Sequence, residues 1–414
     1  MRDKRDAMNR LPPATEGTAH EPTGAIRPGM LFVINSLEGG GAERVMATLV
    51  RASVDLYPRH PITLALLDRT AMAYDPPPGV NLVQLDCRGR LLPSAIALRN
   101  LVAQLRPHAV LSFLTRSNVA NVIATRGRPA ACIISERVNT SVHFGAGGWA
   151  GKALVRLFYG RADHVIPVSE GVADDLAQNF GVSPDHMTVI PNPVDHDAIT
   201  SMVGETPVLR LARPYIVAVG RLVPSKNFAM LIEAFARSEL DGDLVILGEG
   251  PLRETLERQA RTLGLEGRVH LPGFVENPFA IIARSTLFAL PSNAEGFPNG
   301  LVEAMACGRP VVAANCPSGP SEILLGLPRH SVTATIYCPA GTIVPPNDPS
   351  LFAAALRQVH DDPERELRGK TALEASRAFS VERTVRQYWD VIERGRPSGN
   401  PRTGNAIELQ EIKR

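Results

Sequence analysis

Two glutamates, Glu295 and Glu303, stand eight positions apart in the segment PSNAEGFPNGLVEAMACGRP. The apolar run before them predicts a buried strand. Asn299 is a residue type that caps helices, and Gly308 is a typical helix stop. Glu295 is therefore expected in a loop, and Glu303 about one turn inside the following helix. Two carboxylates at such a junction suit the hydroxyl groups of a sugar and of a ribose, because carboxylates accept hydrogen bonds from hydroxyls.

The predicted start of this helix is also a candidate anion site. The backbone N–H groups of Gly300 and Leu301 are expected to point out of the positive helix end, where a phosphate binds well. A diphosphate held there would lie between the sugar and the ribose. Two glutamates at this spacing are common by chance, so the inference depends on the whole segment.

A second segment supplies fixed positive charge. A predicted strand ends at Gly220, where the missing side chain lets a ligand approach the backbone, and Arg221 and Lys226 follow. When a nucleoside diphosphate departs, negative charge develops on its β-phosphate, and preorganised cations stabilise that charge in the transition state. Taken alone, these residues suit a solvated basic turn equally well. Beside the glutamates, they are expected to bind phosphate.

A third segment, Gly39-Gly40-Gly41, follows the first predicted strand and precedes a helix. Consecutive glycines before a helix form a flexible loop that can bind an anion. The spacing differs from the G-x-G-x-x-G dinucleotide fingerprint. A tight turn without a ligand is the alternative.

The elements around these segments predict two α/β domains. From residue 30 onward, short β-branched runs alternate with helical patterns such as 228–237, 252–263 and 352–360, which favours parallel sheets built from βαβ units. The expected strands cover residues 31–35, 62–67, 82–85, 110–114, 132–135, 165–168, 215–220, 244–247, 269–271, 287–290 and 311–314. We predict two doubly wound, Rossmann-like domains that face each other across a cleft, with ligands at the carboxyl ends of the strands.

The predicted boundaries divide the chain into six parts. They are a disordered extension (1–28), an acceptor-side domain (29–200), a linker (201–213), a nucleotide-sugar-binding domain (214–379), a helix (380–394) and a polar tail (395–414). The helix at 380–394 carries Tyr388 and Trp389 and is expected to pack back across the domain joint.

Composition excludes several classes of protein. The 414 residues exceed one typical domain, and the net charge of +2 with 5% aromatic residues and no recognition motif does not predict a nucleic-acid partner. The five cysteines have no metal-knuckle spacing, which favours a reducing, cytoplasmic location and no metal site. Asp241-Gly242-Asp243 has the D-x-D form used by metal-dependent sugar transferases, but it precedes a strand and is interpreted as a turn. No apolar run is long enough to predict a transmembrane helix.

Charge is unevenly distributed. Residues 87–161 hold eleven Lys or Arg and one acid, Glu136, with apolar residues interleaved. Such a face suits an anionic membrane surface or an acceptor that carries a pyrophosphate. Ordinary solvated surface charge is the alternative.

Over residues 30–393 the chain resembles the retaining glycosyltransferases of family 4, which have the GT-B fold. The segments that carry the resemblance are SLEGGGAERVMATLV, VIPNPVD, VAVGRLVPSKNFAMLIEAFA, LVILGEGP, SNAEGFPNGLVEAMACGRPVV and CPSGPSEIL. The resemblance implies three catalytic residues. Glu295 would hydrogen-bond the donor sugar, and Arg221 and Lys226 would bind the diphosphate. It implies donor binding by Glu303 on the ribose, by Gly220, and by the segment Phe297, Pro298, Asn299, Gly300 and Leu301. Phe274 would frame the base, and Gly39–Gly41 would lie near the phosphates and the acceptor.

The resemblance also implies the reaction. A hexose or N-acetylhexosamine would pass, with retention and without a metal or other cofactor, from a UDP- or GDP-linked donor to a saccharide or polyprenyl-pyrophosphate-linked glycan. Such transfer would belong to cell-surface polysaccharide synthesis, by an enzyme at the inner face of the cytoplasmic membrane. Retention is compatible with a front-face reaction and with a double displacement. A nucleotide-sugar epimerase, a phosphorylase and a non-catalytic membrane scaffold on the same fold are the alternatives.

Two features depart from the family pattern. Where many members have a histidine that contacts the donor sugar, this chain has Ser135-Glu136-Arg137, with His143 a few residues later. Either Glu136 or His143 is a candidate for that contact. The segment 327–338 is longer than usual, and no function is assigned to it.

Overall fold

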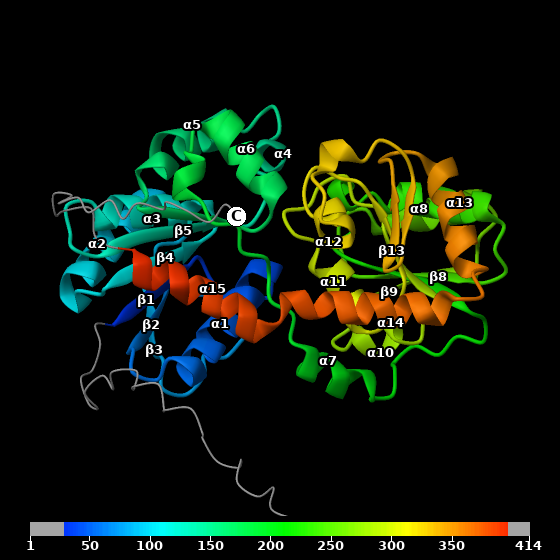
Figure 1. The fold of residues 1–414 in the computed structure, drawn as a ribbon, viewed down its shortest axis with the longest axis horizontal. Coiled ribbons are helices and arrows are strands. Elements are labelled where there is room, and N and C mark those ends of the chain that lie inside the picture. Colours follow the sequence, from blue (N-terminus) through cyan, green and yellow to red (C-terminus); the bar gives the residue numbers. More distant parts are fainter. Residues whose placement is uncertain (1–28, 396–414) are drawn as a thin grey trace, which may run out of the picture.

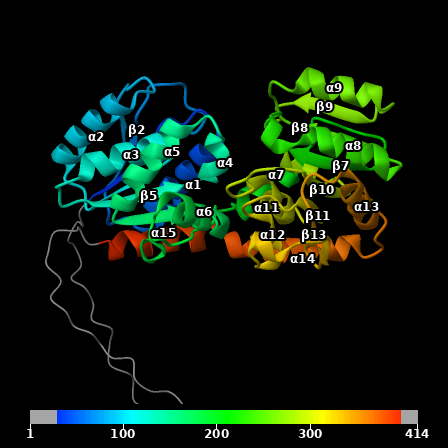
Figure 2. The same ribbon diagram turned by 90° about the horizontal axis from the view of Figure 1, so that it is seen from above.

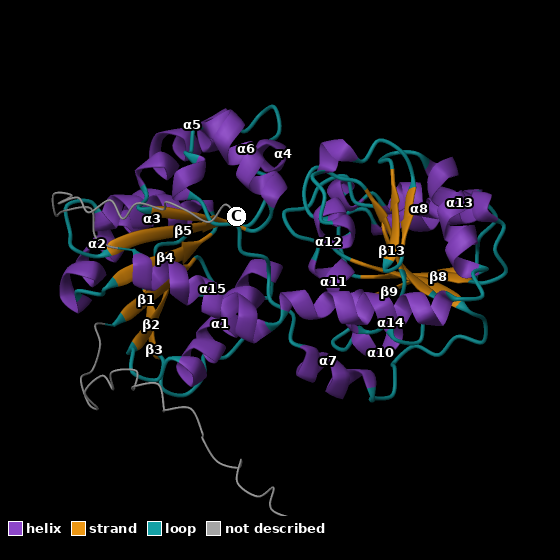
Figure 3. Cartoon of the chain, in the orientation of Figure 1, coloured by secondary structure: helices purple, strands orange, loops and turns teal. Residues whose placement is uncertain are grey.

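The computed structural model describes residues 29–395, which form two α/β domains lying side by side (Figure 1). The predicted extension 1–28 and all but the first residue of the predicted tail lie outside these described residues. Each domain is a sheet flanked by helices (Figure 3), which confirms the predicted fold class.

The first domain contains six parallel strands in the order β3-β2-β1-β4-β5-β6. Their bounds are β1 Met30–Ile34, β2 Ile62–Leu66, β3 Asn81–Gln84, β4 Ala109–Phe113, β5 Ala131–Glu136 and β6 His164–Pro167. Every residue of β1, β2, β4 and β5 is buried, because helices cover both faces of a parallel sheet. The helices are α1 Gly41–Leu56, α2 Leu91–Leu105, α3 Thr115–Thr125, α4 Thr140–Phe144, α5 Trp149–Phe158 and α6 Glu170–Phe180.

The second domain contains seven strands in the order β12-β13-β11-β10-β7-β8-β9. Their bounds are β7 Tyr215–Val219, β8 Asp243–Leu247, β9 Val269–Gly273, β10 Leu287–Leu290, β11 Val311–Ala314, β12 Ile336–Cys338 and β13 Gly341–Val344. All pairs are parallel except β12 with β13. The helices are α7 His196–Val203, α8 Phe228–Ser238, α9 Arg253–Thr262, α10 Phe279–Ile282, α11 Asn299–Ala306, α12 Pro320–Leu325, α13 Pro349–His360 and α14 Arg365–Ser376.

The eleven strands predicted from the sequence are confirmed within two residues at each end, and β12 and β13 are additions to that set. Strand β12 lies in a segment to which no element was assigned. Strand β12 is a three-residue antiparallel strand in the segment 327–338, which thereby extends the edge of the second sheet. The Asn315 side chain fixes this segment by donating to the carbonyls of Arg329 (3.1 Å) and Val332 (3.0 Å).

The chain crosses between the domains earlier than the predicted boundary. Helix α7 contacts α10 and α11 of the second domain, and Asn277 donates a hydrogen bond to the Met202 carbonyl at 2.8 Å. Residues 196–200, which the predicted boundary assigned to the first domain, and residues 201–203 of the predicted linker therefore lie on the second domain.

The chain then returns to the first domain through its last helix, α15 Val381–Arg394. Helices α14 and α15 lie end to end along one side of both domains (Figure 2). Tyr388 and Trp389 of α15 are fully buried against the first domain. The Trp389 ring stacks on Tyr57, the C-cap of α1, with 4.2 Å between centroids, and its Nε1 donates to Ser53 Oγ at 2.8 Å.

We predict that Trp389→Ala lowers the free energy of unfolding by about 3–5 kcal/mol, because it removes a buried aromatic ring and leaves a cavity. Urea titration followed by circular dichroism measures this change. Trp149→Ala is the matched control: Trp149 is 76% exposed, and a change within about 0.5 kcal/mol is expected there. Equal effects of the two substitutions would show that α15 does not stabilise the first domain.

Candidate active site

The two charged segments of the second domain meet because their strands are neighbours. Strands β7 and β10 pair in parallel at the position where the strand order reverses, so the loops after them share one crevice. The Asn293 N–H donates to the Ser225 carbonyl at 2.8 Å, and Asn227 Nδ2 donates to Asn293 Oδ1 at 3.1 Å. The structure thus brings the predicted glutamate segment and the predicted cation segment together.

Lys226 and Glu295 form an ion pair between these loops. Lys226 Nζ and Ser292 Oγ each donate to Glu295 Oε1 at 2.6 Å. The Glu295 side chain is 9% exposed and that of Lys226 is 25% exposed, so the pair is largely shielded from water. Both donors use one carboxylate oxygen, which leaves Oε2 available for a ligand hydroxyl.

Arg221 is exposed, and its turn is supported by a glycine loop. Leu222 N–H donates to the Glu249 carbonyl at 2.9 Å. A Cβ at Gly248 would lie 2.1 Å from the Gly220 carbonyl oxygen, and Gly248 has a φ of +136°, so glycine is required there. The loop after β8 therefore fixes the backbone that carries Arg221 and leaves the guanidinium without an ion pair among residues 29–395.

The start of α11 differs from the prediction in two respects. Asn299 is the first helical residue and not the cap; its Oδ1 accepts a hydrogen bond from Asn192 of the first domain at 2.6 Å. The Leu301 N–H is already used, because it donates to the Pro298 carbonyl at 3.0 Å. The Gly300 N–H lies in the first turn, where no helical carbonyl is available to accept it.

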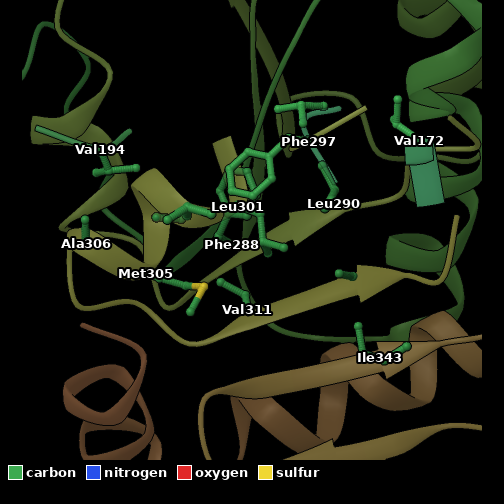
Figure 4. Close-up of a cluster of buried hydrophobic side chains, with 14 of the residues drawn as sticks. Val172, Val194, Phe288, Leu290, Phe297, Leu301, Met305, Ala306, Val311 and Ile343 are labelled. Carbon is green, nitrogen blue, oxygen red and sulfur yellow. The ribbon is translucent and has the colours of Figure 1, made fainter. Parts of the chain in front are cut away.

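The Phe297 side chain is part of the core. It is 7% exposed and belongs to a buried cluster with Phe288 and Leu301 (Figure 4), and it also packs on Phe379 with ring centroids 5.5 Å apart. Only the backbone of this residue can serve the site. Its burial anchors the loop that carries Glu295.

Glu303 contacts the first domain. Its Oε1 accepts a hydrogen bond from Arg44 Nη2, in the first turns of α1, and the pair is partly exposed. Tyr74 lies beside this pair: burial raises the pKa of its phenol, and Arg44, Glu43 and Glu303 are the charges that act on it. The sequence did not assign either Arg44 or Tyr74 to the site.

The glycine loop faces the start of α11. Gly39 has a φ of +118°, Gly40 is the N-cap of α1, and Gly41 is its first residue. A Cβ at Gly41 would lie 3.2 Å from Asn299 Nδ2. The positive ends of α1 and α11 therefore converge across the domain interface, which is an arrangement that favours a bound anion. The Glu43 carboxylate folds back against Gly40. A ligand that approaches the Gly40 backbone would therefore contact this carboxylate.

Further polar contacts hold the domains together. Ser169, the N-cap of α6, donates to the Gly296 carbonyl at 2.7 Å. The Glu322 carboxylate accepts the N–H groups of Glu170 (2.7 Å) and Gly171 (3.0 Å) at the same helix start. The burial of Glu170 beside Glu322 raises the pKa of the Glu170 carboxyl. The loop that carries Glu295 is thus fixed by contacts from the first domain.

The structure does not place Glu136 where it could contact a sugar. Its side chain is fully buried and accepts hydrogen bonds from Tyr159 Oη and from the Arg137 N–H (2.9 Å), and burial raises the pKa of its carboxyl. Tyr159 Oη is in turn bonded by Asn118 Nδ2 at 3.0 Å. Glu136 therefore belongs to a buried network of the first domain, and its predicted role is wrong.

His143 is exposed on α4, where its ring packs edge-on against Phe144 at 5.0 Å. The structure does not bring it to either glutamate. Phe274, which follows β9, is 80% exposed, and its N–H donates to the Glu249 carboxylate. An exposed ring beside the β8 loop suits stacking on a base, and this assignment stays a prediction.

Metal ligands are not grouped in the described part of the chain: residues 29–395 contain no cluster of three or more His, Cys, Asp or Glu side chains that could hold an ion. Asp243 of the D-x-D segment is the first residue of β8, at the opposite end of that strand from the donor loops, and it pairs with His270 at 3.1 Å. Within the same residues, no helix has the length and apolar character needed to span a membrane.

Two family models match the chain. Residues 39–198 match the model described as Glycosyltransferase Family 4, and residues 213–362 match the model described as Glycosyl transferases group 1. The two matches correspond to the two domains of the fold.

One relative extends the match over most of the chain, and a second matches less than half of it. An N-acetylgalactosamine-N,N'-diacetylbacillosaminyl-diphospho-undecaprenol 4-alpha-N-acetylgalactosaminyltransferase from Campylobacter jejuni is 31% identical over 367 residues, which cover 85% of this chain and 96% of the relative. A lipopolysaccharide 1,6-galactosyltransferase from Salmonella typhimurium is 30% identical over 184 residues, which cover 43% of this chain and 49% of that protein.

Solved structures share the fold. Alr3699/HepE from Anabaena, crystallised with UDP, superposes with a TM-score of 0.71 at 22% identity and covers 88% of this chain and 99% of its own. Sucrose-phosphate synthase from Thermosynechococcus elongatus gives a TM-score of 0.73 at 17% identity, with 88% and 98% covered. Because both domains match the family models and a relative aligns over nearly its full length, the chain belongs to the glycosyltransferases of family 4, with the GT-B fold.

Proposed function

We propose that this glycosyltransferase moves a hexose or N-acetylhexosamine, with retention, from a nucleotide diphosphate-sugar to a lipid-linked or saccharide acceptor of a bacterial surface glycan. The observation that carries the proposal is the meeting of Glu295, Glu303 and Lys226 with the starts of α1 and α11 at one interface. Carboxylates for hydroxyls and positive charge for a diphosphate lie within one site.

The donor would span the start of α11. Glu303 would accept hydrogen bonds from the ribose hydroxyls, and the free Oε2 of Glu295 would accept one from the donor sugar. The diphosphate between them would meet the Gly300 N–H, Arg221 and Lys226. Lys226 and the backbone that carries Arg221 are held in place before the reaction, which reduces the reorganisation needed to stabilise the charge of the leaving phosphate.

The proposed transfer breaks the bond between the anomeric carbon and the β-phosphate oxygen. The acceptor hydroxyl attacks from the face that the phosphate leaves, and its proton passes to the departing phosphate oxygen, so the configuration is retained. Glu295 is held by Lys226 and Ser292, which suits a residue that positions the sugar. We propose that no metal is needed, because Arg221 and Lys226 supply the positive charge.

The relatives support the choice of substrates. The Anabaena protein was crystallised with UDP and with UDP-glucose, which makes UDP the first nucleotide to test. The Campylobacter jejuni relative is named for a diphospho-undecaprenol acceptor, and the Salmonella typhimurium relative for lipopolysaccharide. A polyprenyl-pyrophosphate-linked saccharide is therefore the first acceptor class to test.

The reaction itself is tested with UDP-sugars and an undecaprenyl-diphosphate-linked saccharide, in the presence of EDTA, with products followed by mass spectrometry. A product heavier by one hexose or N-acetylhexosamine residue is expected. An isomerised donor without an added acceptor would identify an epimerase. Absence of both with every donor that binds would contradict transferase activity towards this acceptor class.

We predict that Arg221→Ala and Glu303→Ala each weaken UDP binding about 10- to 100-fold, because each removes a charge-assisted hydrogen-bond partner. The thermal shift caused by UDP measures the effect, since ligand binding to the native state raises Tm by mass action. Arg261→Ala and Glu266→Ala change exposed residues of the same domain and serve as controls. Shifts equal to wild type in both site variants would contradict the donor-site assignment.

We further propose that the first domain binds the anionic inner face of the cytoplasmic membrane. One side of α5 combines the exposed Trp149 (76%) and Leu157 (52%) with Lys152 and the exposed Arg156. Trp149, Lys152 and Arg156 are spaced by three and four positions, so they share one face of the helix, and Leu157 lies about two turns after Trp149 at the edge of that face. Aromatic and basic side chains on one face are typical of helices that lie at a membrane surface.

The double substitution Lys152→Gln and Arg156→Gln is expected to reduce binding to phosphatidylglycerol vesicles by about tenfold or more, because each basic residue near an anionic surface contributes about 1 kcal/mol. Vesicle sedimentation measures the bound fraction. Lys370→Gln with Arg383→Gln, at exposed sites elsewhere, is the control. Equal sedimentation of the two double variants would remove this surface from the proposal.

A further inference from the structure

Arg44 occupies the carboxylate that the donor ribose would need. Its Nη2 donates to Glu303 Oε1 across the domain interface, and the side chains of Arg44 and Glu303 are 40% and 14% exposed. A guanidinium N–H and a ribose hydroxyl are both hydrogen-bond donors, so both can bond to this carboxylate oxygen. While Arg44 holds Glu303, its guanidinium competes with the ribose for that oxygen.

A donor that displaces Arg44 leaves a cation at the positive ends of two helices. Arg44 lies in the first turns of α1, directly after the glycine loop, and Gly41 faces Asn299 of α11. Tyr74 is half-buried and lies close enough to Arg44 and Glu303 for their charges to act on its phenol. The acid of the same turn, Glu43, is folded back on Gly40. The phosphates of the donor are then the anion within reach of the displaced guanidinium.

We infer that Arg44 exchanges partners when the donor binds: it releases Glu303 to the ribose and binds the diphosphate. Arg44 is thereby a donor-binding residue supplied by the acceptor-side domain. The inference rests on the proposed function, and its ligand class is a nucleoside diphosphate. Guanidinium groups suit this role because their paired N–H groups match phosphate oxygens.

The exchange ties domain closure to the donor. Without a ligand, the interface is held in part by the contact between Arg44 and Glu303. With a donor bound, Arg44 of the first domain and Glu303 of the second contact the same molecule at its phosphates and its ribose. One contact between domains is replaced by two contacts through the ligand, so closure is retained when the pair breaks.

The exchange predicts opposite effects of one substitution on two ligands. Arg44→Ala removes a phosphate contact, so the affinity for UDP falls at least about tenfold. The same substitution frees Glu303, so uridine, which has the ribose and lacks phosphate, binds at least as tightly as to wild type. Calorimetric titration of the full chain measures both. Arg51→Ala, on the exposed side of the same helix, is the control and leaves both affinities unchanged.

A second variant, Glu303→Gln, distinguishes the exchange of partners by Arg44 from a structural defect caused by Arg44→Ala. In the Glu303→Gln background there is no carboxylate to free, so adding Arg44→Ala leaves the uridine affinity of its parent unchanged, yet it still weakens UDP binding. Unchanged UDP affinity in Arg44→Ala would overturn the inference, and so would a loss of uridine affinity as large as the loss for UDP. Wild-type protein that binds neither UDP, GDP nor ADP would overturn the proposed function itself, and the inference with it.

Discussion

The pairing of β7 with β10 is the constraint on which the site depends. These strands are far apart in the chain, but they lie side by side in parallel, so their carboxyl ends deliver two loops to the same place. One loop carries Lys226 and the other Glu295, and the two side chains form an ion pair there. The glycine loop after β8 and the buried Phe297 ring then fix the backbone on each side. Without this strand order, the charged segments would be unrelated surface turns.

The second constraint is that the site belongs to both domains. The start of α1 meets the start of α11, and Asn192 bonds Asn299 across the interface. The chain also crosses back to the first domain through helix α15, which packs there with Trp389 stacked on Tyr57. A donor bound at α11 is therefore within reach of groups from the acceptor-side domain. Under the proposed function, this geometry would hold donor and acceptor close together, which is what a transfer between two substrates requires.

The fold was predictable because buried parallel strands produce apolar runs that can be read without knowledge of their neighbours. The second-domain part of the site was predictable for a similar reason: Glu295, Lys226 and Gly220 each lie next to a strand end. The contacts that residues make across the domain interface were not predictable from the sequence. Whether Asn299 caps its own helix or bonds Asn192, and whether Glu136 faces a ligand or Tyr159, depends on side-chain direction and on contacts between distant segments. Arg44 stands within a glycine-rich segment that was identified, but its partner is 259 positions away.

The Glu322 carboxylate has a consequence for motion. It accepts the N–H groups of Glu170 and Gly171 at the start of α6, and also the Gly319 N–H in its own domain. One side chain of the second domain therefore completes the first turn of a helix in the other. If the domains separate, those two amide hydrogens lose their acceptor and become open to water, whereas the rest of α6 keeps its internal bonds. The exchange rates of the Glu170 and Gly171 amides with solvent deuterium therefore report how often the two domains separate.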